Sequence, residues 1–282
     1  DEHEHVFATD EEGVERLTQL RHQHIPMILQ DQAYHEWRDH GVKEFGHGWV
    51  AITPIQSSTE FVGVFCNDSA ISGAPIDDTK QEIISVLCSL LGAVIERRDF
   101  EERQQRLSRG LRTVVALADE LLLCHDVDSV YRRAVDLARE RLDIERCAIF
   151  LREGTRMRGT FGTNMDRQTT DEAAHAFEAY PGWLEQMSTS NPQDRQMIIR
   201  EEPYSEWRDG RVLRFDSGWV AITPLSSTAG VIGIFSNDTA ITKTPVDDVQ
   251  QEIITVFCSL LGPVIEQKRA GQALRRAHDS LE

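Results

Sequence analysis

The stretch that decides the fold is Gly218-Trp-Val-Ala-Ile-Thr-Pro-Leu225, because almost the same stretch occurs earlier in the chain as Gly48-Trp-Val-Ala-Ile-Thr-Pro54. Farther along, Gln81-Glu-Ile-Ile84 returns as Gln251-Glu-Ile-Ile254. Residue 48 recurs at 218 and residue 81 at 251, so the offset between the copies is a constant 170 residues. A period of this length corresponds to a whole domain and not to a solenoid repeat, so the pattern predicts a duplicated domain.

The two copies are not equally complete in this sequence. The second copy begins with a helix-like segment near Gly110, and its first part, residues 110–170, has no counterpart before residue 1. We therefore expect the first copy to lack its N-terminal part, with residue 1 as a boundary set by cloning, processing or ordering within a longer natural protein. A sheet without those strands exposes an unpaired edge, which proteins normally cover. We expect a partner chain or a similar element to cover it.

Within the second copy, the spacing of apolar residues predicts the secondary structure. Apolar side chains recur every three or four positions over Val127–Leu142, as on one face of an amphipathic helix. The predicted strands cover residues 147–151, 158–163, 197–199, 218–225 and 231–236, and the other predicted helices cover 172–186, interrupted by Pro181-Gly182, and 247–267. Hairpin-type connections favour an antiparallel sheet, six-stranded or similar, with helices packed on it, over a βαβ nucleotide-binding fold.

The helix that closes the first copy is predicted to continue into the second. No proline occurs between Pro75 and Pro181, and apolar residues keep near-heptad spacing, so we expect one helix over residues 79–123. Helices with such a seam commonly pair with another copy, which predicts a homodimer through the long helices. The predicted division is a partial domain at 1–98, a connecting helix at 99–124, a complete domain at 125–266 and a C-terminal helix at 267–282.

Three segments carry a resemblance to a known family. They are Gly218-Trp-Val-Ala-Ile-Thr-Pro-Leu225, Gly233-Ile-Phe-Ser-Asn-Asp238 and Asp247-Asp-Val-Gln-Gln-Glu252. They resemble bacterial GAF domains, in which a "G-W-x-A-x-x-P-L" strand precedes a "G-x-x-x-x-N" strand and an acidic C-terminal helix. The resemblance covers the whole second copy and the first copy from its middle onward. It implies an α+β fold, a GAF-like antiparallel sheet flanked by helices, in two copies joined by a long helix.

The resemblance also implies a function. GAF pairs joined by long helices resemble the non-catalytic input regions of histidine kinases, cyclic-dinucleotide enzymes or transcription regulators, so we expect a sensory, small-molecule-binding and dimerisation module. The terminal Leu274-Arg-Arg-Ala-His-Asp-Ser-Leu281 looks like a signalling helix that leads to a C-terminal output domain absent from this chain. Family members bind cyclic nucleotides, tetrapyrroles, haem, small metabolites or nothing detectable, so the cofactor stays unknown.

Composition excludes several classes of function. The net charge of −17 would repel a polyanionic duplex, so we expect no nucleic-acid partner. No run of 18 apolar residues occurs, so we expect no membrane span. The five cysteines are odd in number and scattered in apolar runs, and the acidic N-terminus is unlike a signal peptide. These features predict reduced thiols and a cytoplasmic location.

A repeated group of aromatic and arginine residues gives the candidate ligand site. Pocket walls are typically aromatic with a few polar groups, and an arginine among aromatic rings suits an anionic or planar ligand. The same residue types also fill cores and cap sheet edges. The candidate ligand-binding residues are Tyr204, Trp207, Arg208 and Trp219, with Tyr34, Trp37, Arg38 and Trp49 in the first copy.

Other residue types give weaker candidates. Cys124-His125 lies at the end of the connecting helix, where the family does not attach a bilin. Asn237-Asp238 and Asp247-Asp248 lie where cyclic-nucleotide-binding members carry polar residues, but the expected lysine and phenylalanine are missing, so a turn and a helix cap are favoured. Cys88 and Cys258 are expected to be helix-packing thiols.

Neither a metal site nor catalysis is predicted. Seven of the ten histidines lie in the first 47 residues, including His3, His5, His22 and His24, where a solvated terminus is favoured over a metal site. No nucleophile–base pair or phosphate-binding loop occurs, so we expect no enzyme. Two alternatives stay open: a ligand-free structural dimerising spacer, which would lack a cavity of about 300 Å³ near the tryptophans, and a small redox enzyme, which would need thiols within bonding distance.

Overall fold

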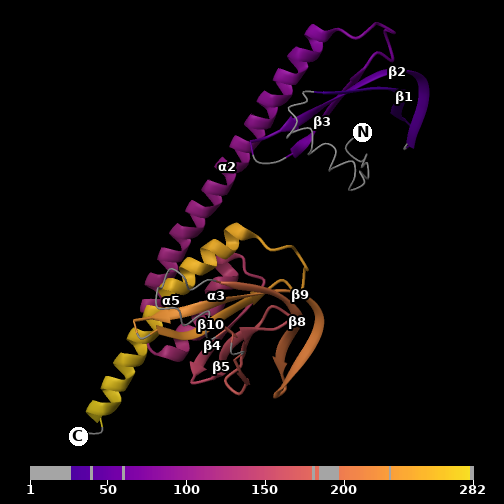
Figure 1. The fold of residues 1–282 in the computed structure, drawn as a ribbon. Helices are drawn as coiled ribbons and strands as arrows, with labels where there is room; N and C mark the ends of the chain where they lie inside the picture. The colour runs from indigo at the N-terminus through magenta and orange to yellow at the C-terminus, as the bar shows by residue number, and fades with distance from the viewer. Residues whose placement is uncertain are drawn as a thin grey trace. The chain divides into compact units, whose positions relative to one another are not determined.

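The computed structural model describes residues 27–38, 41–58, 61–179, 182–183, 197–228 and 230–279, except the side chains of Trp37 and Arg38. The chain divides into two compact units, which we call unit 1 (Asp1–Glu102) and unit 2 (Arg103–Glu282). Figure 1 shows the elements of each unit along the chain. The four-part division derived from the sequence stays a prediction.

Unit 1 contains a three-stranded antiparallel sheet in the order β1-β2-β3. The strands are β1 (Ile28–Arg38), β2 (Gly41–Gln56) and β3 (Phe61–Asp68). Helix α2 (Asp78–Leu122) follows as one helix of 45 residues, and its residues 78–102 belong to unit 1. The continuous helix predicted over residues 79–123 is therefore confirmed.

Two glycines in α2 lie where this helix packs closely against a neighbouring element. A Cβ atom on Gly92 would lie 1.9 Å from the carbonyl oxygen of Gln56, so only glycine lets α2 approach the end of β2 this closely. In unit 2, a Cβ atom on Gly110 would lie 2.2 Å from the Ile253 side chain. Close packing therefore offsets the low helix propensity of both glycines.

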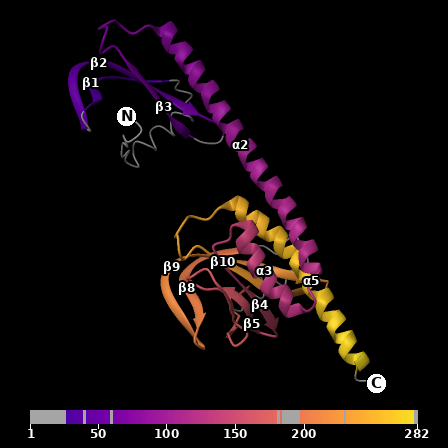
Figure 2. The same ribbon diagram turned by 180° about the vertical axis from the view of Figure 1, so that it is seen from behind.

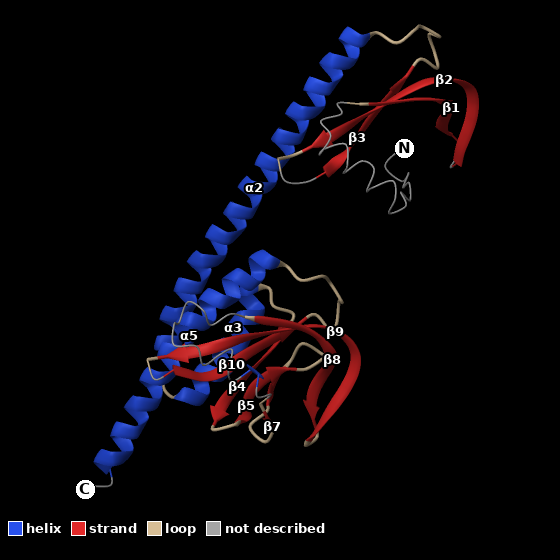
Figure 3. Ribbon diagram, in the orientation of Figure 1, coloured by secondary structure: helices blue, strands red, loops and turns tan. Residues whose placement is uncertain are grey.

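Unit 2 contains a seven-stranded antiparallel sheet in the order β6-β5-β4-β10-β9-β8, with β7 also paired to β5. Figure 3 shows strands in red and helices in blue. The strands are β4 (Arg146–Glu153), β5 (Arg156–Thr163), β6 (Thr169–Asp171), β7 (Ala176–Glu178), β8 (Ile198–Arg208), β9 (Arg211–Ser227) and β10 (Gly230–Asp238). Its helices are the C-terminal part of α2, α3 (Val127–Leu142) and α5 (Asp248–Asp279).

Two apolar clusters lie on opposite faces of this sheet. Asp126 caps α3 by accepting a hydrogen bond from the Ser129 amide at 2.7 Å, and Asp143 ends the helix in a left-handed conformation. Figure 2 shows α3 and α5 on the sheet. The helical cluster contains Val114, Leu117 and Leu121 of α2, Val130, Ala134 and Leu137 of α3, Ile149, Phe235, and Ile254, Phe257 and Leu261 of α5. The second cluster contains Phe150, Met157, Trp183, Tyr204, Val220, Ile222 and Ile234.

The α+β class, an antiparallel sheet flanked by helices, is confirmed. The helix predicted over residues 172–186 is wrong over residues 172–179, where the chain forms a turn and then β7. Residues 182–183 are helical, and residues 180–181 and 184–186 lie outside the described part. Good helix formers occupy this segment, but pairing with β5 and burial of Glu172 and His175 override their propensity. The short strand predicted at 197–199 is the start of β8, which continues to Arg208.

Candidate functional site

Unit 2 contains a cavity of about 600 Å³ on the face of the sheet that carries the second apolar cluster. This volume lies in the range of small-molecule sites. Strands β4, β8, β9 and β10 supply most of its wall, and the end of β5, the turn before β7, β7 itself and Trp183 supply the rest. The wall includes Arg146, Phe150, Glu172, His175, Phe177, Trp183, Glu202, Trp207, Arg214, Ile222, Ile234 and Asp238.

Aromatic side chains from three elements meet on one side of the cavity. The His175 ring stacks on Trp207 with ring centroids 5.0 Å apart and an interplanar angle of 7°. Phe150 meets His175 edge-on at 5.3 Å and Phe177 at 5.1 Å. Such contacts hold the rings in fixed orientations, so this side of the cavity is formed before any ligand binds.

The turn before β7 is held by a buried polar pair. The Nδ1 atom of His175 lies 3.4 Å from Oε2 of Glu172, and both residues are buried. The Glu172 amide donates to the carbonyl oxygen of Thr160 at 2.8 Å, and a Cβ atom on Gly162 would lie 2.1 Å from the Glu172 carboxylate. The glycine in β5 therefore makes room for the carboxylate that positions His175 at the cavity.

Arg146, the first residue of β4, is the buried cation of the site. Its Nη2 donates to the carbonyl oxygen of Ser205 at 2.7 Å and its Nε to that of Thr163 at 3.3 Å. Its Nη1 lies 3.4 Å from Oδ1 of Asp238 on β10 and 3.4 Å from the sulfur of Met165. Burial raises the pKa of Asp238, and Arg146 opposes that shift. Arg146 therefore ties four segments together, with its charge offset by Asp238.

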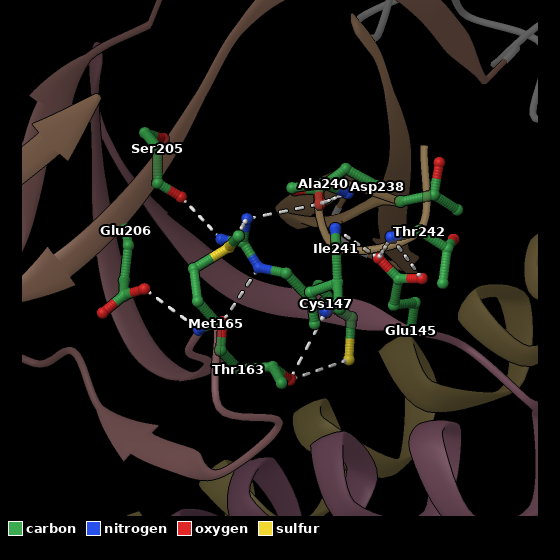
Figure 4. Close-up of polar contacts among 12 residues, drawn as sticks. Glu145, Cys147, Thr163, Met165, Ser205, Glu206, Asp238, Ala240, Ile241 and Thr242 are labelled. Carbon is green, nitrogen blue, oxygen red and sulfur yellow. Dashed lines mark hydrogen bonds and ion pairs between the residues drawn. The ribbon is translucent and has the colours of Figure 1, made fainter. Parts of the chain in front are cut away.

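Glu145, the residue before Arg146, connects the start of β4 to the segment between β10 and α5. The Glu145 carboxylate accepts hydrogen bonds from the amides of Ile241 at 2.6 Å and Thr242 at 3.1 Å (Figure 4). Asp238 in turn accepts from the Ala240 amide at 3.0 Å. These contacts fix the connection that leads from β10 to α5. Arg146 lines the cavity, and its neighbour Glu145 holds the connection to α5. These two adjacent residues therefore link the cavity wall to the N-terminus of α5.

Of the residues predicted for the second copy, Trp207 lines this cavity and the other three do not. Arg208 is half-exposed and donates to Glu206 at 2.6 Å. Tyr204 is buried, and a Cβ atom on Gly218 would lie 1.9 Å from its hydroxyl oxygen. Trp219 lines a separate polar hollow of about 500 Å³ and donates its indole N–H to the carbonyl oxygen of Thr244 at 2.8 Å.

The first-copy counterparts make the matching contacts in unit 1. The Tyr34 hydroxyl oxygen lies 3.0 Å from Oγ of Ser69. A Cβ atom on Gly48 would lie 2.0 Å from the same Tyr34 oxygen. Trp49 donates its indole N–H to the carbonyl oxygen of Ala74 at 2.9 Å. The side chains of Trp37 and Arg38 lie outside the described residues. Sheet packing and turn anchoring therefore explain why both copies carry the tyrosine, the glycine and the second tryptophan.

Sequence reasoning missed most of the cavity wall. Phe150 and Ile222 belong to apolar strands whose two faces look alike in the sequence. His175 and Phe177 lie in the segment wrongly predicted as helix. Arg146 had one usable signal, since a charged residue directly before a buried apolar strand either reaches solvent or needs a buried partner.

The weaker candidates can also be placed. Cys88 and Cys258 are both buried, and burial raises the pKa of Cys258 well above its ordinary value, so its thiol is not a thiolate near neutral pH. In the described part of the chain, no three histidine, cysteine or acidic residues cluster as metal ligands. His3, His5, His22 and His24 lie outside that part. No helix among the described residues has the length and apolar character needed to cross a membrane.

Comparisons with known proteins give structural matches alone. No protein-family profile and no curated protein matches the chain. The GAF domain of an Acinetobacter phosphoenolpyruvate-protein phosphotransferase is similar at 14% identity and a TM-score of 0.41, over 58% of this chain and 97% of that one. The GAF domain of a putative sensor histidine kinase from Pseudomonas syringae pv. tomato is similar at 16% identity and 0.36, over 64% and 99%. The phycoerythrobilin-bound GAF domain of a cyanobacterial phytochrome is similar at 12% identity and 0.41, over 60% and 99%.

Proposed function

We propose that this chain is a non-catalytic sensory module of a cytoplasmic signalling protein, in which unit 2 is a GAF-type domain that binds a small molecule. The observation that carries the proposal is the cavity of about 600 Å³ with a preformed aromatic wall. The motifs at Gly218-Trp-Val-Ala-Ile-Thr-Pro-Leu225 and Gly233-Ile-Phe-Ser-Asn-Asp238 support the same family.

The proposed signal passes from the cavity to α5. A ligand that contacts the wall near Trp207 or Asp238 favours one arrangement of the Arg146 contacts. Because Glu145 and Asp238 hold the connection before α5, that arrangement also sets the position of the helix N-terminus. The ligand must bind one arrangement more tightly than the other, and each tenfold difference in affinity shifts the equilibrium by about 1.4 kcal/mol.

The same proposal includes a homodimer through the long helices and a C-terminal output domain supplied beyond this chain. On α2, the side chains of Ile83, Leu87, Leu90 and Val94 follow four-three-four spacing and are exposed. This seam suits pairing with a second helix of the same kind. Dimerisation would let the helices of two protomers shift together toward the output domain.

The two alternatives receive less support. A purely structural spacer would have filled cores, whereas the cavity of unit 2 lies beside Trp183 and Trp207. A small redox enzyme would need thiols within bonding distance, whereas Cys66, Cys88, Cys124, Cys147 and Cys258 are all free in the structure. Both considerations favour the sensory function.

Native mass spectrometry of the purified chain tests the proposal, followed by thermal-shift titration with each small molecule that co-purifies. Trp207→Ala should weaken binding of that molecule about tenfold or more, because it removes a ring from the cavity wall. Arg208→Ala, one residue along and outside the wall, is the matched control and should bind like the parent. Equal loss in both variants, or binding that survives Trp207→Ala unchanged, would contradict the proposed site.

A further test addresses the signal. Glu145→Gln keeps the shape of the side chain but weakens the hydrogen bonds to Ile241 and Thr242. We expect this variant to bind the ligand normally while the ligand-induced change in hydrogen exchange over residues 239–250 disappears. If the change persists at full size, the signal does not pass through Glu145.

A further inference from the structure

Strands β3 and β10 occupy equivalent places in the repeated sequence but have different neighbours. Residues 61–68 correspond to residues 231–238 at the offset of 170 residues. In unit 2, β10 lies between β9 and β4, and its contact with β4 is antiparallel, with Asp238 opposite Arg146. Among the described residues of unit 1, β3 pairs with β2 on one side and forms the sheet edge on the other.

The apolar side chains beside this edge are exposed in unit 1 and buried in unit 2. Phe65 is 39% exposed, whereas its equivalent Phe235 is 0% exposed. On the helices, Leu91 is 41% exposed and Leu261 is 1% exposed. In unit 2 these positions are covered by the helical cluster, to which α3 and β4 contribute. As far as the described residues of unit 1 go, its surface therefore has the composition of a core without the elements that would cover it.

Polar groups at the end of β3 give a second, independent indication. Asp68 is exposed, and among the described residues only the Ala70 amide is recorded as a partner of its carboxylate. The equivalent Asp238 pairs with Arg146. In the same described part, no acceptor is recorded for the amides of Ile71 and Ser72, whereas the equivalent amides of Ile241 and Thr242 donate to Glu145.

We propose that the β3 edge, Asp68, the amides of Ile71 and Ser72, and the α2 face around Leu91 form a docking surface for a polypeptide segment that the described residues do not supply. The segment is an amphipathic helix followed by an antiparallel strand. The strand begins with an acidic residue and an arginine, and apolar residues follow. The carboxylate of the acidic residue accepts hydrogen bonds from the amides of Ile71 and Ser72. The arginine pairs with Asp68, and the apolar residues cover Phe65. This inference concerns unit 1 and does not depend on the cavity of unit 2.

Charge favours such a segment over a second copy of β3. An antiparallel pair of β3 strands would extend the sheet, but Phe61–Asp68 contains neither lysine nor arginine. Asp68 of each copy would therefore stay without a cation, and the amides of Ile71 and Ser72 without a carboxylate. Residues 144–153, in contrast, begin Ile-Glu-Arg and continue with apolar residues, which is the chemistry that already satisfies the equivalent edge in unit 2.

The test uses the full chain and a labelled peptide of residues 126–153 of this protein, with Cys147→Ser to prevent oxidation. Fluorescence anisotropy measures binding, and hydrogen exchange of the complex locates it. We expect saturable binding that slows exchange over residues 61–68, while exchange over residues 231–238 is unchanged because that edge is already paired.

Charge reversal makes the test specific. Asp68→Lys in the chain, or Arg146→Glu in the peptide, should each weaken binding about tenfold, and the two together should restore part of it, as expected for a direct ion pair. Glu44→Lys, at an exposed position of β2, is the matched control and should bind like the parent. Circular dichroism checks that each variant is folded.

Three results would overturn the proposal. The peptide does not bind, or it binds with no change in exchange over residues 61–68. The double charge reversal binds no better than the single variants. The chain alone forms a dimer in which residues 61–68 are protected, and Val64→Lys abolishes the dimer, which would make a second copy the occupant of the edge.

Discussion

Leu91 and Leu261 are the same residue at equivalent positions of their helices, yet one is exposed and the other buried. Around them the local sequence is nearly repeated, and both helices approach the preceding sheet through a glycine, Gly92 and Gly262. The difference lies in what covers them: α3 and β4 pack in the core of unit 2. Local sequence therefore determines the elements, and burial depends on the segments that pack against them.

Several contacts within about 40 residues of sequence recur in both units, whatever covers them. Trp49 and Trp219 donate to backbone carbonyls 25 residues onward. The Ser58 amide donates to Glu96 at 3.0 Å, and the Thr228 amide donates to Glu266 at 3.2 Å. These shared contacts make unit 1 a natural control for unit 2, since the same substitution can be made in both.

The largest expected contrast comes from the paired phenylalanines. Phe235→Ala should lower the free energy of unfolding of unit 2 by about 3–5 kcal/mol, because it leaves a cavity in the helical cluster. Phe65→Ala should lower that of unit 1 by about 1 kcal/mol or less, since its side chain is already partly in water. Hydrogen exchange of the slowest amides in each unit measures both values. Equal losses would mean that Phe65 is covered in solution.

The paired aspartates should give the next contrast. Asp238→Ala removes the counter-ion of the buried Arg146 and should destabilise unit 2 by about 3 kcal/mol. Asp68→Ala should change unit 1 by about 0.5 kcal/mol. Urea denaturation followed by exchange in each unit distinguishes them. A small effect at Asp238 would show that Arg146 does not need its carboxylate, and the proposed path to α5 would lose its first contact.

Substitution of the two equivalent glycines, Gly92 and Gly262, should have similar effects on stability, in contrast to the phenylalanines and aspartates. A Cβ atom would lie 1.9 Å from a backbone oxygen at Gly92 and 2.0 Å at Gly262. Gly92→Ala and Gly262→Ala should therefore each cost about 1–3 kcal/mol, because the helix must move away from the sheet. Thermal unfolding and exchange give the two values. An effect in unit 2 alone would mean that α2 does not pack on β2 in solution as described.

The smallest expected effect concerns the cap of α3, which has no described equivalent in unit 1. Hydrogen bonds from Ser129, the backbone amide first, lower the pKa of Asp126. The carboxylate therefore stabilises α3 above the ordinary pKa of about 4, and this contribution is lost as the pH falls toward the lowered value. Asp126→Ala should destabilise α3 at neutral pH, and its difference from the parent should shrink on acidification.

Asp126→Ser is the matched control for that prediction. Serine also caps helices but does not titrate in this range. The difference in α3 stability between Asp126→Ser and the parent should therefore change with pH in a different way from the difference for Asp126→Ala. Exchange of the α3 amides at several pH values gives the comparison. A difference for Asp126→Ala that is constant from neutral to acidic pH would show that the charge plays no part.

The sequence predicted much of the fold because its patterns are local. The period of apolar residues located α3, and the absence of proline together with near-heptad spacing located α2. The β8 strand was recognised only at its start, because Glu201, Glu202 and Pro203 interrupt the apolar pattern while pairing with β9 continues. The turn at Glu172 and His175 could not be predicted, since it depends on pairing with a distant strand.

The candidate site was harder to predict than the fold. Trp207 was selected as an aromatic residue beside an arginine in a repeated motif, and it lines the cavity. Tyr204 and Trp219 were selected for the same reason, but their repeated partners are a glycine and a carbonyl group. Repetition within a chain therefore marks structural and ligand-facing residues alike. Arg146 has no counterpart in unit 1, so the repeat could not point to it.

Hydrogen exchange of the chain alone tests the central claim most directly. Two equivalent segments are compared in one experiment: residues 61–68 of β3 and residues 231–238 of β10. The comparison between the units predicts slow exchange in the unit 2 segment and exchange faster by orders of magnitude in the unit 1 segment. Equal, slow exchange in the two segments would contradict it, because the β3 edge of unit 1 would then already be covered.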